Sequence, residues 1–221
     1  MSEHFDVSER GNLLTFTPKT TELCSNVYLV NGDTFIDLGN PEYTRELADN
    51  LIGQGIYLKT IKRIFLTHLH FDHVGDSTLF TNAEVYATPE SIASLKENPE
   101  RELWLSYTRD GRNDGQAGKG FQQNLEDGKI SIRPLDEALQ NLTYSKETLK
   151  SHQASGGGYF LMQGHTPGSC AIVLSKGIFI GDAYGHRKAP TATNNSHKKR
   201  FISFIRNYCV QIFKGHDEKG C

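Results

Sequence analysis

The sequence lacks any long hydrophobic run. No segment of its 221 residues approaches the roughly 18 consecutive apolar residues that a transmembrane helix needs. The chain starts with the polar stretch MSEHFDVSER, which has no apolar core of the kind found in secretory signals. We therefore expect no membrane association and a cytoplasmic location.

Cysteine is scarce, and the spacing of the cysteines matches no disulfide or metal-binding pattern. The sequence has 4 cysteines, at positions 24, 170, 209 and 221, and none belongs to a CxxC pair. This spacing excludes a disulfide-stapled scaffold and a cysteine-rich zinc motif. In a cytosolic chain of this length, the cysteines are expected to be free thiols, buried or exposed.

An excess of charge of either sign is also missing. The chain has 24 basic and 26 acidic residues, a formal net charge of -2, so nothing global favours nucleic acid or an anionic membrane as a partner. Its composition, 37% hydrophobic and 23% charged, is typical of soluble globular proteins. Without an obvious repeat or linker, we expect a single domain over residues 1–221.

Short β-rich segments alternate with helical ones along the chain. Turn residues separate the segments, and Asn31-Gly32-Asp33 is expected to close a hairpin. The order strand–helix–strand–helix predicts an α/β fold. Strands are expected at 13–18, 26–32, 34–40, 61–68, 83–89, 129–135, 155–165, 169–177, 178–184 and 209–216, and helices at 41–55, from Pro89 onward and at 196–207.

Residues 97–127 differ from their surroundings, being polar and rich in glycine. Such a stretch predicts a long loop or a helical excursion, and excursions of this length often serve as lids. It contains Trp104, Tyr107 and Phe121. These aromatic residues suit a cover over a site for an acyl or aromatic substrate, or alternatively a contact in a homodimer.

The stretch THLHFDH, residues 67–73, concentrates metal-binding side chains. His68, His70, Asp72 and His73 all belong to residue types that bind zinc and similar divalent ions. In an extended strand end, positions 68 and 70 point to the same side, so that both imidazoles can reach one ion. Asp72 and His73 follow a turn and are expected to address a second point nearby.

Three further candidates follow, each beside a glycine and at the end of a predicted strand. They are His165 in QGHTPGS, Asp182 in IGDAYGH and His216 in FKGHDE. Strand ends are where function gathers in sheet proteins. Isolated histidines, such as His4, are expected to be ordinary surface or packed residues, and we assign His152 and His197 to the same class.

The motifs THLHFDHVGD, GHTPGS, IGDAYG and FKGHDE, in this order, resemble the metallo-beta-lactamase-fold metallo-hydrolase superfamily, with its glyoxalase II-like and lactonase-like hydrolases. The resemblance implies an αββα sandwich with a metal site at the sheet edges. It also implies two zinc ions, with iron or manganese as alternatives. The ligands that it implies are His68, His70 and His165 for the first ion, Asp72, His73 and His216 for the second, and Asp182 as the bridge.

The resemblance further implies a dinuclear zinc hydrolase that attacks a small-molecule ester, thioester, lactone or amide with a metal-bridging hydroxide. Asp72 is expected to orient the nucleophile or relay a proton. Tyr184 is expected either to donate a hydrogen bond to the substrate or simply to pack. Thr67, Thr166 and Ser169 are expected to support the ligands or to stabilise turns.

Two alternatives within the same fold remain open. One is a redox enzyme of the non-haem iron persulfide dioxygenase type. The other is a phosphodiesterase, for which the locally basic segment 186–206, including His186, would meet an anionic substrate, unless it is a solvated helix face. The helical substrate domain usual in glyoxalase II-like thioesterases is not expected, because the chain ends five residues after His216.

Overall fold

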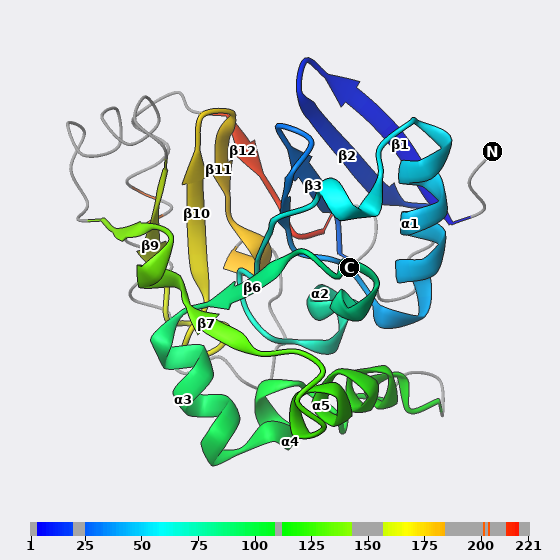
Figure 1. Cartoon of the computed structure of the whole chain (residues 1–221). Helices are drawn as coiled ribbons and strands as arrows, with labels where there is room; N and C mark the ends of the chain where they lie inside the picture. Colours follow the sequence, from blue (N-terminus) through cyan, green and yellow to red (C-terminus); the bar gives the residue numbers. More distant parts are fainter. Residues whose placement is uncertain are drawn as a thin grey trace.

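The computed structural model describes residues 4–19, 25–108, 112–142, 157–183, 201, 203 and 211–216. Two mixed β-sheets face each other, with helices on the outer side of the larger sheet (Figure 1). The seven-stranded sheet has the order β1 (Phe5–Arg10), β2 (Leu13–Pro18), β3 (Val27–Val30), β4 (Thr34–Ile36), β5 (Arg63–Phe65), β6 (Glu84–Ala87) and β7 (Ile132–Pro134).

Within this sheet β1 to β4 pair antiparallel, whereas β4 to β7 pair parallel. The parallel half is connected through helices, as parallel pairing requires. These helices are α1 (Thr44–Gly53), α2 (Phe71–Val74), α3 (Pro89–Glu97), α4 (Pro99–Glu102) and α5 (Gly118–Glu126). The five-stranded sheet has the order β12 (Ile212–Phe213), β11 (Gly177–Phe179), β10 (Cys170–Leu174), β9 (Gly158–Leu161) and β8 (Gln140–Asn141).

Strand alternation explains the layers. In β10, Ile172 packs into the core between the two sheets, while Val173 lies in a separate core with Phe201 on the opposite face. In β3, Val30 belongs to the inter-sheet core and Leu29 to a core shared with α1. Because successive residues of a strand face opposite sides, a strand that is apolar at every position must be covered on both faces. The αββα sandwich is confirmed.

Most predicted elements are present, with shorter bounds. The hairpin through Asn31-Gly32-Asp33 is confirmed, with Asn31 and Gly32 at φ 56° and 74°. Strand β1 was not predicted, because it is a solvent-facing edge strand in which Phe5 is the one buried residue. The predicted helix at 196–207 lies largely outside the described residues.

No helix in the described part of the chain is long and apolar enough to cross a membrane.

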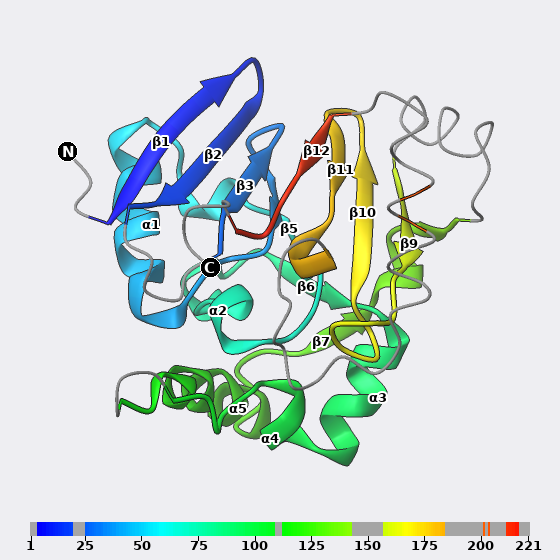
Figure 2. The ribbon, with the colours of Figure 1, turned by 180° about the vertical axis from the view of Figure 1, so that it is seen from behind.

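The described part of the 97–127 stretch contains α4, a short 3-10 helix and α5, joined by turns, and it packs against the rest of the fold. Leu103, Leu105 and Phe121 are buried in the same core as α1. The amide of Phe71, the first residue of α2, donates to the carbonyl of Leu103 at 3.1 Å. Helix α5 lies beside α2, and α4 lies beside α5, in both views (Figure 1, Figure 2). The stretch therefore supports the segment that contains the histidine motif.

Glu102, at the end of α4, is an acidic residue buried within this support. Its side chain is 1% exposed and accepts a hydrogen bond of 2.6 Å from the hydroxyl of Ser94. Burial raises the pKa of the Glu102 carboxyl above the usual 4.5, against the smaller opposing effect of the hydrogen bonds. The folded protein therefore holds this proton more tightly than the unfolded chain does.

In the unfolded chain the Glu102 carboxyl ionises near pH 4.5, whereas in the folded protein it ionises at a higher pH. The free energy of unfolding therefore falls as the pH rises from about 4.5 through the raised pKa of the folded state. Glu102→Gln cannot ionise and should flatten this part of the stability curve, as measured by urea unfolding between pH 4 and pH 8. Glu100→Gln, at an exposed position of the same helix, is the control and should leave the curve as in the wild type. Parallel curves for Glu102→Gln and the wild type would contradict this account.

Candidate metal centre

The ends of strands from both sheets bring together the side chains of the histidine motif and those of three distant loops. The motif follows β5, a second loop joins β9 to β10, and the remaining two segments follow β11 and β12 (Figure 2). All the side chains concerned are at most 5% exposed except one, which is half-buried. These residues are His68, His70, Asp72, His73, His165, Asp182 and, as the half-buried member, His216.

The potential ligand atoms form three overlapping groups, within each of which the atoms lie within 4.8 Å of one another. The first group is His68, His70 and His165, and the imidazole nitrogens of the last two are 3.0 Å apart. The remaining groups are His68, His73 and Asp182, and Asp72, His73 and His216. The structure therefore assembles all seven side chains, while their role as metal ligands stays a prediction.

Asp182 lies between the groups. Its Oδ2 is 3.3 Å from His165 Nε2, and its Oδ1 is 3.2 Å from His73 Nε2 and 3.4 Å from His216 Nε2. Two ligand atoms bound about 2.0–2.1 Å from one tetrahedral zinc ion lie roughly 3.3 Å apart. The spacing of the cluster therefore matches that of atoms which share a cation.

Unsatisfied polar atoms support the same interpretation. His68 Nε2, His70 Nε2 and Asp72 Oδ1 are buried and have no hydrogen-bond partner among the described residues. A buried polar atom without a partner costs about 1–3 kcal/mol. Several such atoms converge here on one small volume, and their donor set of imidazole and carboxylate suits zinc, iron or manganese. The residues present thus fit a metal centre.

The sequence analysis placed His68 and His70 at an extended strand end, and this was wrong in detail. Strand β5 ends at Phe65, and His70 already caps α2. The reason is Asp37, whose carboxylate accepts bonds of 2.8 Å from both the amide and the hydroxyl of Thr67. These bonds take the place of further sheet pairing and turn the chain toward the cluster.

Asp37 is the functional residue that the sequence analysis missed. Besides the two bonds from Thr67, its carboxylate pairs with His73 Nδ1 at 2.9 Å. It is 2% exposed and has a φ of 55°, a left-handed conformation that is uncommon outside glycine. A carboxylate behind an imidazole fixes the tautomer and orientation of a metal-binding histidine. An acidic residue in the middle of the strand predicted at 34–40, TFIDLGN, was the available signal.

Two glycines let the loops approach closely. A Cβ on Gly181 would lie 2.3 Å from Thr67 Oγ1, and one on Gly215 would lie 2.5 Å from Asp182 Oδ1. Larger residues would therefore push apart the segments that carry Thr67, Asp182 and His216. The glycines noted beside these residues in the sequence serve close packing.

The ionisation states follow from burial and from neighbouring charges. Burial lowers the pKa values of His68 and His70 well below 6.5, and for both residues nearby imidazoles act in the same direction. For His73, burial also lowers the pKa, but the carboxylates of Asp182 and Asp37 outweigh it and raise the pKa above 6.5. Burial raises the pKa of Asp182, yet His216 and His73 hold it well below 3.8.

Other predicted participants divide into two classes. The Thr166 amide donates a hydrogen bond of 3.0 Å to the Ser169 hydroxyl, and the hydroxyls of the two residues are hydrogen-bonded at 2.9 Å. These bonds stabilise the turn after His165. Thr67 lies 3.2 Å from His68 Nδ1 and so supports that ring directly. Tyr184 and His186 lie outside the described residues, so their roles stay predictions.

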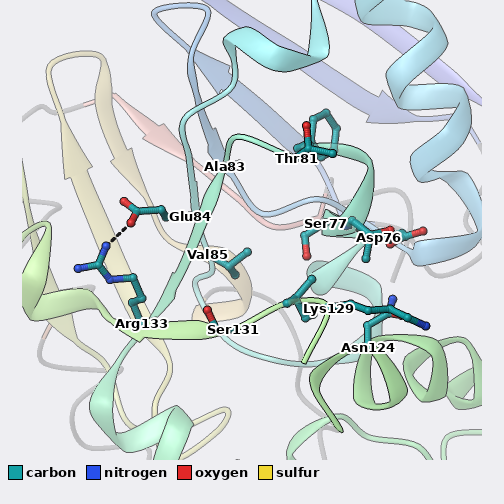
Figure 3. A pocket seen from close by; sticks show the side chains of 13 residues that line it. Asp76, Ser77, Thr81, Ala83, Glu84, Val85, Asn124, Lys129, Ser131 and Arg133 are labelled. Atoms are coloured by element: carbon teal, nitrogen blue, oxygen red, sulfur yellow. Dashed lines mark hydrogen bonds and ion pairs between the residues drawn. The ribbon is translucent and has the colours of Figure 1, made fainter. Parts of the chain in front are cut away.

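A cavity of about 570 Å³ lies away from the cluster, between β6, β7 and the end of α5 (Figure 3). None of the seven clustered residues lines it. Its cationic side chains are already paired, Arg133 with Glu84 and Lys129 with Asp127. It therefore gives no reason to place the reaction there.

Comparisons with known proteins agree with this architecture. The sequence profile of the Metallo-beta-lactamase superfamily matches residues 20–183. No curated protein sequence matches the chain significantly. Among solved structures, the dizinc quorum-quenching lactonase AidC, in complex with a product, has a TM-score of 0.57 at 18% identity, covering 96% of this chain and 90% of that one.

Two further structures are similar in fold. TTHA1623 in a di-iron-bound form has a TM-score of 0.56 at 20% identity, with 89% of each chain covered. The Rm3 metallo-beta-lactamase has a TM-score of 0.53 at 17% identity, with 94% of this chain and 76% of that chain covered. At these identities the likeness establishes the shared fold.

Replacement of Asp37 should weaken metal binding. Asp37→Asn removes the charge behind His73, and loss of such an outer partner typically costs about 10- to 100-fold in metal affinity. Competition with a chromophoric chelator measures the effect on zinc. The control is Asp33→Asn, whose carboxylate pairs with Arg63 away from the cluster. Equal zinc affinity in wild type, Asp37→Asn and Asp33→Asn would refute the role of Asp37.

Proposed function

The chain belongs to the metallo-beta-lactamase superfamily and is a metal-dependent hydrolase, and from this premise we propose that it is a two-zinc hydrolase of a small ester, thioester, lactone or amide. The observation that carries the proposal is the position of Asp182. One of its carboxylate oxygens faces His165 of the first group, and the other faces His73 and His216. A carboxylate so placed suits a bridge between two ions.

The residues divide between two sites. His68, His70 and His165 would hold one ion, while Asp72, His73 and His216 would hold the other. When bound, such ions lower the pKa of water toward 7 and polarise the substrate's scissile group. The neutral imidazoles of His68 and His70 and the ionised carboxylate of Asp182 are the protonation states that metal ligands require.

Asp72 is proposed to act on protons as well as to bind. Its Oδ2 lies 3.3 Å from His216 Nε2, whereas its Oδ1 is buried without a hydrogen-bond partner among the described residues. Its pKa is strongly lowered: burial opposes this, but the charges of His73 and His216 outweigh burial. An ionised carboxylate with one unused oxygen can orient the attacking water or relay its proton.

Zinc is proposed because imidazole and carboxylate ligands suit it, and because a full second set of ligands favours a dinuclear site over a single iron. Iron and manganese fit the same donors. Similar folds occur in dizinc and di-iron forms, those of AidC and TTHA1623. The metal is therefore decided by analysis of the purified protein.

Elemental analysis of the purified protein should find about two zinc per chain, and a screen of lactones, thioesters, esters, β-lactams and phosphodiesters should find acyl hydrolysis. His68→Ala should lower metal content and reduce turnover by more than about 100-fold, the upper end of the loss from outer-shell changes alone. The control is His4→Ala, since His4 pairs with Glu46 outside the cluster.

Three results would contradict the proposal. One is a single iron per chain with sulfur-dependent oxygen uptake, which would assign a persulfide dioxygenase activity instead. Another is cleavage of phosphodiesters without cleavage of acyl substrates. The third is a His68→Ala variant with unchanged metal content and unchanged hydrolysis, which would show that the site assignment itself is wrong.

A further inference from the structure

Trp104 lies against the metal centre. Its ring centroid is 4.9 Å from that of His70 with an angle of 37° between the planes, and it is 4.2 Å from the ring of Tyr107. Trp104 and Tyr107 are half-buried, whereas the residues on either side of Trp104, Leu103 and Leu105, are 0% and 3% exposed. The rings of Trp104 and Tyr107 thus form a partly accessible aromatic surface beside the predicted ligand His70, whereas Leu103 and Leu105 are buried in the core.

The backbone at Trp104 has an uncommon conformation. Its φ is 56°, a left-handed value that bulky residues rarely adopt. Such residues gather at ligand clamps and active sites, where the surrounding structure holds them in place. Leu103 and Leu105 enter the core on either side, and the left-handed residue between them carries the indole toward His70 instead.

Close packing holds this turn. A Cβ on Gly115 would lie 2.5 Å from the carbonyl oxygens of both Trp104 and Leu105, so only glycine allows the two segments to touch. The Gly115 amide donates to the Tyr107 carbonyl at 3.1 Å, and the Tyr107 amide donates to the Trp104 carbonyl at 3.1 Å. The position of the indole is therefore fixed by the fold around it.

The same support is tied to the ligand segment. The Phe71 amide donates to the Leu103 carbonyl at 3.1 Å, and a Cβ on Gly118 would lie 3.0 Å from the Phe71 Cβ. His70 directly precedes Phe71 at the start of α2. In consequence, Trp104 and His70 belong to one packed unit, in which the indole has a set position beside the proposed reaction site.

Resting on the proposed function, we propose that Trp104, together with Tyr107, forms an apolar wall that binds the acyl part of the substrate and selects extended acyl groups over acetyl. A surface beside the His70 ring is next to the bond that the enzyme would cleave. Aromatic rings offer a large apolar area, and a partly accessible indole gains most when an apolar chain covers it. Trp104 is thereby a specificity-determining residue.

The first test compares kcat/KM for octanoyl and acetyl esters of the same phenol. Each methylene that is fully buried contributes about fourfold, so two or three methylenes on the wall predict a preference of roughly 15- to 60-fold for the octanoyl ester in the wild type. In Trp104→Ala this ratio should fall by about tenfold or more, mainly through KM. Trp104→Phe keeps a flat ring and should retain most of the ratio.

Tyr57→Ala is the matched control, because Tyr57 is an aromatic residue that is 75% exposed and precedes β5, whereas the histidine motif follows the end of that strand. It should keep the wild-type ratio. If Trp104→Ala lowers kcat/KM equally for both esters, or lowers zinc content while the ratio persists, Trp104 only supports His70 and the proposal is overturned.

The second test does not require turnover. Trp104 is the one tryptophan of the sequence, so intrinsic tryptophan emission reports on this position. Octanoate added to the zinc-loaded protein should shift the emission to shorter wavelength and saturate, whereas acetate at the same concentration should not. No saturable shift with octanoate would overturn the proposal.

The two tests separate the wall from the chemistry. A saturable octanoate shift in a protein that hydrolyses no acyl substrate would support the wall and refute the proposed function. Acyl hydrolysis without chain-length preference and without an emission shift would refute the wall while the proposed function stands.

Discussion

Seven ionisable side chains, six buried and one half-buried, gather where the strands of two sheets end, and this constraint explains much of the surrounding structure. Buried imidazoles and carboxylates are costly unless they share charge or hydrogen bonds. The cluster meets that requirement in part through mutual contacts of 3.0–3.4 Å, and a pair of bound cations would meet the remainder. Apolar cores on both faces of the sheets hold these charges in place.

The sandwich is what allows ligands from distant parts of the sequence to converge. The histidine motif follows the larger sheet, whereas His165, Asp182 and His216 follow strands of the smaller one. The inter-sheet core, with Ile172 and Phe65 among its members, sets how these two edges meet. Asp37 and Thr67 then orient the motif, and the Trp104 segment supports it from the outer side. Stability and the proposed chemistry thus depend on the same packing.

Much of this was predictable from the sequence, because the signals are local. Dense ligand spacing in THLHFDH and glycine beside each distant candidate identified the residues that the fold brings together. The order of strands and helices predicted an α/β fold, and the resemblance to the family implied the αββα sandwich. Strand β1 was not predicted, because an exposed edge strand has little hydrophobic pattern. The role of Asp37 was missed, and Trp104 was predicted only as part of an aromatic cover, not as a neighbour of His70, for another reason. Their roles come from left-handed backbone and from contacts with residues more than 30 positions away, which no local pattern encodes.

The central claim is that the cluster holds two metal ions bridged by Asp182. Crystals of the zinc-loaded protein, with diffraction recorded above and below the zinc absorption edge, test it directly. The account predicts two anomalous peaks about 3.5–4 Å apart, one among His68, His70 and His165 and the other among Asp72, His73 and His216, with an oxygen of Asp182 between them. A single peak, a pair of peaks elsewhere, or none in a zinc-loaded crystal would contradict it.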